Sequence, residues 1–168
     1  KHESITVSLP STAQIHLTRF FLNKKNLGPP VFMLHSIAAG SSTFFSADGK
    51  GLASYLARAG FDVFVADLRG RGKSWPKIGA AASFGLTETI TEDIPALLGK
   101  IVARRGQIPQ IWIGHGWGSV LMMSYYARFG NEISPVEKMV HFGSRRQMVV
   151  ANHSKALRFD WQWRKLGH

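Results

Sequence analysis

Residues 111–119, Ile-Trp-Ile-Gly-His-Gly-Trp-Gly-Ser, constrain the fold more than any other stretch of the sequence. Three apolar residues lead into a corner with three glycines, and the helix-forming run 120–128 follows at once. This order predicts a strand, a sharp turn and a helix. Gly114 and Gly118 let the strand and helix approach closely, and Gly116 tolerates a positive φ because it has no Cβ.

The rest of the chain repeats this alternation of strands and helices. Apolar runs and turn residues predict strands at residues 5–9, 14–22, 31–34, 61–66, 111–113 and 136–143. Helices are expected at 51–59, from Thr91 to the stop signal at Gly106, and at 120–128. The first two strands form an antiparallel hairpin around residues 10–12, and the later alternation predicts a mostly parallel sheet with helices on both faces.

Two loops that follow predicted strands carry further motifs. Residues 35–42, His-Ser-Ile-Ala-Ala-Gly-Ser-Ser, form a loop of mostly small residues after the strand at 31–34. Residues 67–74, Asp-Leu-Arg-Gly-Arg-Gly-Lys-Ser, follow the strand at 61–66. The second run lacks the Walker spacing of a phosphate-binding loop, so it does not predict a nucleotide site.

In this order, the three segments resemble the α/β-hydrolase superfamily. Residues 111–119 resemble its nucleophile elbow, Gly-x-Ser-x-Gly, except that Gly116 stands where the family has its serine. Residues 67–74 resemble the family loop Asp-x-Arg-Gly-x-Gly-x-Ser, and residues 35–42 resemble its His-Gly loop, with Ser36 in place of the usual glycine. The resemblance implies an α/β-hydrolase fold of esterase or lipase type that is incomplete at its C-terminus.

The resemblance also implies domain limits. It covers about residues 5–143, so residues 1–143 are interpreted as the N-terminal part of the core domain. Residues 144–168, which mix basic and aromatic side chains, are interpreted as the start of a cap or lid. The acid and the histidine of a hydrolase triad follow later strands in this family and are absent from this sequence.

The site residues follow from the same resemblance. The backbone N–H groups of Ile37 and Trp117 are expected to form the oxyanion hole. Further structural or pocket roles are expected for His35, Ser36, His115, Asp67 and Arg69, with Asp67 and Arg69 pairing across their turn. Ser119 is expected on the first helical turn, facing the sheet. A plain loop without a catalytic task is the alternative for residues 35–42.

Charge and composition limit the partners. The formal net charge of +11 is compatible with nucleic acid, with an anionic membrane surface, or with an acidic second half of the same protein. No recognised nucleic-acid-binding module is present, so nucleic acid is not expected, whereas membrane-surface contact stays open. The sequence shows neither a signal segment nor a transmembrane run, which favours a cytoplasmic location.

The chemistry that remains is that of a hydrolase without its nucleophile. Cysteine is absent, and no histidine or carboxylate group has metal-ligand spacing, so no metal or other cofactor is expected. An acyl-enzyme cannot form at Gly116. We therefore expect an esterase- or lipase-like protein that acts on or binds an ester or acyl molecule and is inactive as it stands. The alternative is a non-catalytic pseudoenzyme that binds a ligand or a partner.

Overall fold

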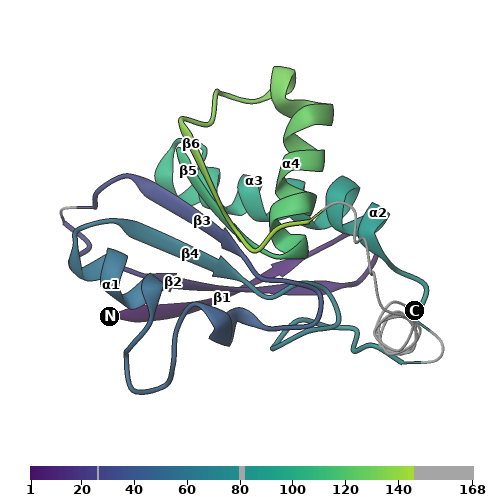
Figure 1. The fold of residues 1–168 in the computed structure, drawn as a ribbon, viewed down its shortest axis with the longest axis horizontal. Helices are drawn as coiled ribbons and strands as arrows, with labels where there is room; N and C mark the ends of the chain where they lie inside the picture. Colours follow the sequence, from purple (N-terminus) through teal and green to yellow (C-terminus); the bar gives the residue numbers. More distant parts are fainter. Residues whose placement is uncertain (26, 80–81, 146–168) are drawn as a thin grey trace.

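A six-stranded sheet in the order β1-β2-β4-β3-β5-β6 forms the framework of the protein (Figure 1). The structure is a computed structural model, and it describes residues 1–25, 27–79 and 82–145. The strands are β1 (His2–Ser8), β2 (Gln14–Phe20), β3 (Pro30–Leu34), β4 (Asp62–Ala66), β5 (Ile111–His115) and β6 (Lys138–Phe142). β1 and β2 pair antiparallel, as predicted, and β2 joins β4 antiparallel. The pairs β4–β3, β3–β5 and β5–β6 are parallel, which confirms the predicted mostly parallel sheet.

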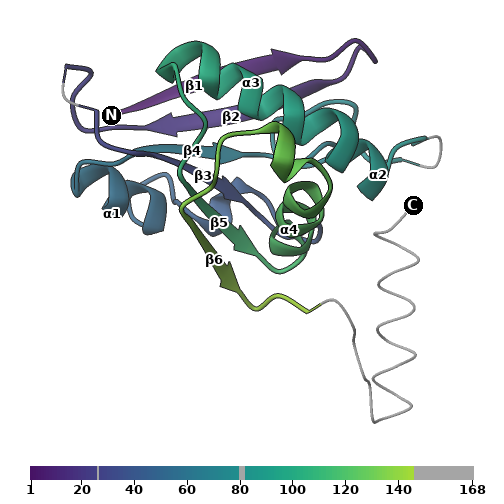
Figure 2. The same cartoon turned by 90° about the horizontal axis from the view of Figure 1, so that it is seen from above.

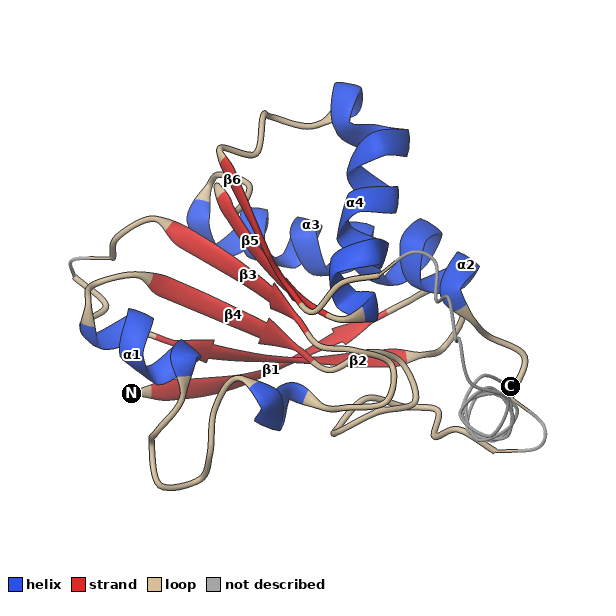
Figure 3. Cartoon of the chain, viewed as in Figure 1, coloured by secondary structure: helices blue, strands red, loops and turns tan. Residues whose placement is uncertain are grey.

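Helices cover both faces of this sheet, as Figures 2 and 3 show. The elements are α1 (Leu52–Arg58), α2 (Leu86–Glu88), α3 (Ile94–Arg105) and α4 (Trp117–Phe129), with short 3-10 turns at Ser41–Thr43 and Gly130–Glu132 and a π-turn at Thr89–Asp93. Phe32 and Leu34 of β3 pack in the cluster that includes α3 and α4. Val31 and Met33, the alternate residues, pack in the cluster that includes α1.

The helical segment before α3 begins earlier than its acidic residues indicated. We predicted a start at Thr91, but the segment begins at Leu86 and passes through the π-turn into α3. The backbone N–H of Gly85 donates to the Glu88 side chain at 2.6 Å, which caps the earlier start. The C-terminal end is as predicted, because Gly106 adopts a left-handed conformation with φ 71°.

The sheet order ends at β6, and this strand carries exposed apolar side chains. Val140 is 38% exposed and Phe142 is 46% exposed, although both belong to a strand. In the parallel register with β5, Val140 lies beside Ile113, which belongs to the core on the α1 side. That face of the sheet therefore continues beyond the helix that covers it.

Candidate functional site at the β5–α4 corner

The corner between β5 and α4 has the sharp geometry that the glycines predict. Gly116 is the only residue between the strand and the helix, with φ 54° and ψ −121°. A Cβ on Gly114 would lie 2.5 Å from the Cα of Ser119, and a Cβ on Gly118 would collide with the carbonyl oxygen of Leu34. The backbone of α4 thus packs directly against β5 at Gly114 and against the end of β3 at Gly118, and a side chain at either position would push the helix away.

Ser36 faces this corner from the loop after β3. An ideal Cβ on Gly116 would lie 2.7 Å from the Ser36 Oγ and 2.9 Å from the Ser36 Cβ. The backbone N–H of Trp117 donates to the Ser36 Oγ over 3.4 Å. The loop predicted to supply one oxyanion donor and the elbow predicted to supply the other therefore lie against each other.

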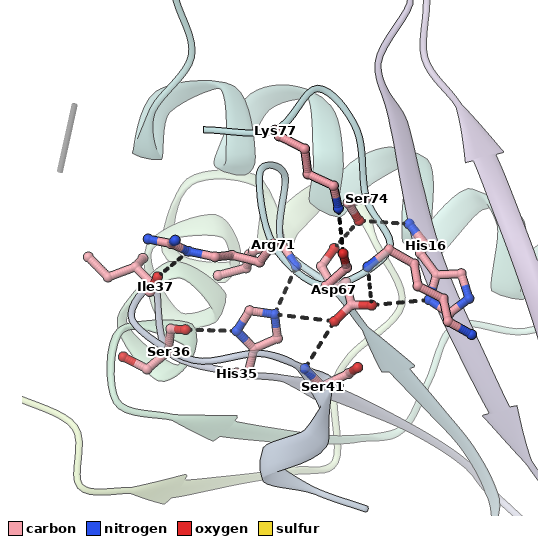
Figure 4. A network of polar contacts seen from close by, with 12 residues as sticks. His16, His35, Ser36, Ile37, Ser41, Asp67, Arg71, Ser74 and Lys77 are labelled. Carbon is pink, nitrogen blue, oxygen red and sulfur yellow. Dashed lines mark hydrogen bonds and ion pairs between the residues drawn. The ribbon is translucent and has the colours of Figure 1, made fainter. Parts of the chain in front are cut away.

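Ile37, the other predicted donor, directly follows Ser36 and is half-buried. Its side chain packs against the core that α3 and α4 cover. Its carbonyl oxygen accepts a 2.6 Å hydrogen bond from the Arg71 Nε, so the side chain of the 67–74 loop holds the backbone of the 35–42 loop (Figure 4). This bond holds the peptide group that directly follows the one carrying the Ile37 N–H.

The two predicted pocket histidines differ in their surroundings. His35 is fully buried: its Nδ1 donates to the Ser36 carbonyl at 2.7 Å and its Nε2 accepts from the Leu68 N–H at 3.0 Å. Burial lowers its pKa, so the ring is neutral and both nitrogens are in use. His115 is half-buried, and its Nδ1 has no hydrogen-bond partner among residues 1–25, 27–79 and 82–145.

Asp67 is the centre of a buried polar network (Figure 4). Its Oδ1 accepts from the Ser41 N–H at 3.0 Å, and its Oδ2 accepts from the Lys73 N–H at 3.1 Å and contacts the His16 Nδ1 at 3.2 Å. Ser74 adds a second connection, because its Oγ donates to the Asp67 carbonyl and accepts from the His16 N–H. The carboxylate therefore joins the 35–42 loop, the 67–74 loop and β2.

Arg69 does not pair with Asp67, contrary to the prediction. Its Nε donates to Asp93 at 3.0 Å, and its Nη2 donates to Glu92 at 2.7 Å. The π-turn that precedes α3 carries both carboxylates, and it brings them to the buried guanidinium from a segment 23 to 24 residues away. Burial raises the pKa of Asp93 to about 6 against the opposing effect of Arg69.

The serine hydroxyl on the first turn of α4 does not face the open side of this corner. Ser119 is fully buried and lies against Gly114, so it faces the sheet as predicted and cannot reach a substrate. Within the described part of the chain, no group of three or more histidine or carboxylate residues could hold a metal ion, and no helix is long and apolar enough to cross a membrane. Residues 146–168, most of the predicted cap or lid, lie outside the described residues.

Sequence reasoning identified the residues of the corner but not their partners. The facing pair Ser36 and Gly116 combines positions 80 residues apart, and only the exchange of a usual glycine for Ser36 marked the first of them. His16 was missed altogether as a partner of Asp67, since it lies in β2 and belongs to no motif. The acidic pair at 92 and 93 was visible in the sequence, but nothing there indicated that Arg69 is its partner.

Comparisons with known proteins agree with this architecture. The model of the protein family described as alpha/beta hydrolase fold matches residues 29–166 of this chain. Human gastric triacylglycerol lipase is 26% identical over 157 residues, which cover 85% of this chain and 38% of the lipase. Lipase lipl-3 of Caenorhabditis elegans is 29% identical over 107 residues, which cover 60% of this chain and 26% of that protein.

Solved structures show the same fold. A bacterial membrane phospholipase A superposes with a TM-score of 0.68 at 16% identity and covers 96% of this chain and 46% of its own. A potato epoxide hydrolase superposes with a TM-score of 0.65 at 20% identity, covering 97% of this chain and 47% of its own. The chain thus spans about half the length of these structures and less than two fifths of the lipases. On the match over residues 29–166 and the observed sheet, the chain belongs to the alpha/beta hydrolase fold family, with esterase- and lipase-like ancestry.

Proposed function

We propose that this chain forms the elbow-bearing part of a lipase-like protein that binds an ester or acyl ligand without forming an acyl-enzyme. The observation that carries the proposal is Gly116, which occupies the single-residue corner between β5 and α4 and offers no nucleophile. The backbone N–H groups of Ile37 and Trp117 are the proposed donors to the ligand's carbonyl oxygen. Such donors stabilise negative charge on oxygen, but they cannot form a covalent bond themselves.

The neighbouring side chains support a binding role over a catalytic one. His35 has both ring nitrogens engaged in backbone hydrogen bonds, so it cannot take a proton from water without breaking the loop. Asp67 is 1% exposed and bound by two backbone N–H groups and His16, so it is not available as a triad acid. We propose that His35, Asp67 and Arg69 shape the site and that the ligand contacts the backbone near Ser36.

A second proposal concerns the remaining half of the fold. The exposed Val140 and Phe142 on β6 and the greater length of the relatives support pairing of this edge with further strands of the same protein. The acid and the histidine of a hydrolase triad would lie after those strands.

Contact with an anionic membrane surface is a separate proposal that rests on the charge of +11 and is tested by vesicle co-sedimentation at low and high salt.

The proposed function is tested by separating binding from turnover. We expect methyl octanoate to bind saturably in isothermal titration calorimetry, while 4-nitrophenyl octanoate is hydrolysed no faster than in buffer. The variant S36L, which fills the corner, should weaken ester binding at least about ten-fold, whereas G99A should not, because nothing lies within 4 Å of a Cβ there. Hydrolysis above the buffer rate by the purified wild-type protein, or equal affinities in S36L and the wild type, would contradict the proposal.

A further inference from the structure

We propose that Ser36 is an internal ligand of the elbow. Its hydroxyl occupies the space that a side chain at position 116 would need, and it takes the Trp117 N–H that a ligand oxygen would otherwise use. The consequence for ligand binding rests on the proposed function, but the steric coupling between residues 36 and 116 rests on geometry alone.

The coupling is steric and cannot be relieved by a rotamer change. A Cβ on Gly116 would lie 2.7 Å from the Ser36 Oγ and 2.9 Å from the Ser36 Cβ, and real Cβ contacts essentially never fall below 3.0 Å. Rotation about χ1 moves the Oγ, but it leaves the Cβ where it is. A side chain at position 116 therefore requires either a backbone shift or the loss of the Ser36 Cβ.

The loop that carries Ser36 is held from both sides and resists such a shift. His35 is fully buried and anchored at both nitrogens, one of them bonded to the Ser36 carbonyl. The Arg71 Nε holds the carbonyl of Ile37 at 2.6 Å. Since neither the loop nor the corner has room, serine at 36 and any side chain at 116 exclude each other in this backbone.

The same contact bears on the oxyanion hole. The Trp117 N–H donates to the Ser36 Oγ over 3.4 Å, a long hydrogen bond, so a ligand oxygen competes with a weakly held hydroxyl. The hydroxyl can turn away about χ1 when a ligand arrives, because only the Cβ is fixed. Ser36 thus keeps the donor occupied in the absence of ligand and lowers the affinity for a carbonyl oxygen.

A double-mutant cycle on the full chain tests the coupling without any ligand. The variants are G116A, S36G and the double variant, followed by thermal unfolding. G116A should lower Tm by roughly 3 °C or more beyond its effect in the S36G background, because overpacking is relieved there. The backbone strain of alanine at φ 54° is present in both backgrounds and cancels.

Gly106 provides the matched control. It also has a left-handed φ of 71°, but nothing lies within 4 Å of its Cβ position. G106A should therefore lower Tm equally in the wild-type and S36G backgrounds. Equal losses from G116A in the two backgrounds overturn the coupling, whereas folding of G116A only together with S36G supports it strongly.

Two further measurements address the hydrogen bond. Amide exchange of the Trp117 N–H should be faster in S36A by roughly three- to ten-fold, because its acceptor is gone. The affinity for methyl octanoate should rise in S36A by a similar factor. Unchanged exchange and affinity overturn the internal-ligand role. Absence of ester binding in every variant overturns the proposed function instead, and the stability cycle and the exchange rates still decide the role of Ser36.

Discussion

Asparagine in place of Asp67 tests the buried network beside the site most directly. The carboxylate is 1% exposed and accepts the backbone N–H of Ser41 on Oδ1 and that of Lys73 on Oδ2. The side chain in D67N would have the same shape, but one of its two terminal atoms would be an NH₂ group. Whichever way this amide turned, one backbone N–H would face a donor and lose its acceptor.

The cost follows from these contacts. An unsatisfied N–H costs about 1–3 kcal/mol where it is buried, as at Ser41, and less at the partly buried N–H of Lys73, while the remaining hydrogen bonds lose their charge assistance in either case. We therefore expect D67N to reduce the free energy of unfolding by about 2–5 kcal/mol, measured by urea unfolding with tryptophan fluorescence at pH 7. The control D48N, at an exposed carboxylate, should leave the urea midpoint nearly unchanged. A loss below about 1 kcal/mol for D67N would refute the reasoning.

The pH dependence of this effect has a definite sign. Burial by itself raises the pKa of Asp67, but the hydrogen bonds from His16 and from the backbone at 73 and 41 outweigh it and hold the pKa well below its usual range. A depressed pKa stabilises the folded state above the unfolded pKa, and this contribution is lost as the pH falls through the folded pKa. The difference between wild type and D67N should therefore stay constant from about pH 5 to 8 and shrink only in strong acid.

Three further substitutions test the packing and charges. G72A should cost about 3 kcal/mol or more, because its Cβ would overlap the Asp67 carboxylate, while G49A, also at positive φ but in open space, should cost about 1 kcal/mol by urea unfolding. G118A should cost about 2–3 kcal/mol in the same assay, because its Cβ would push α4 off the end of β3. Asp93, with its pKa raised to about 6, binds protons more readily when folded, so the wild type should lose about 1 kcal/mol relative to D93N between about pH 5 and 7.5.

Each of these has an outcome that contradicts it. Equal costs of G72A and G49A would show that the carboxylate moves aside without penalty. An unchanged midpoint for G118A would mean that the corner is not closely packed. Parallel stability curves of wild type and D93N across this pH range would mean that Asp93 keeps an ordinary pKa in the folded state.

Local signals in the sequence were sufficient for the framework of the fold. The corner at Gly116, the hairpin around residues 10–12 and the helix end at Gly106 each depend on a few neighbouring residues, and the structure confirms all three. The predicted start of the helical segment before α3 was wrong, because the carboxylates at 92 and 93 resemble a helix start but serve as partners of Arg69.

Long-range partners were the part that the sequence could not supply. Asp67 and Arg69 stand two residues apart and carry opposite charges, so pairing was the simplest expectation. In the fold, each side chain has its partner on another element: Asp67 contacts His16 of β2, and Arg69 donates to Asp93 just before α3. The contact between residues 36 and 116 likewise depends on β3 and β5 lying side by side, which no local pattern encodes.

The Asp67 network also has a consequence for the order of folding. Its hydrogen bonds join β2, the loop after β3 and the loop after β4, across sequence separations of 51 and 26 residues. The bond from Ser41 requires β3 and β4 to have been assembled, and the contact with His16 requires β2 and β4, so we expect both to form after the folding barrier has been crossed. Loss of the carboxylate should therefore accelerate unfolding and leave the refolding rate almost unchanged. We therefore expect the network to form late in folding and to set the unfolding rate of the assembled sheet.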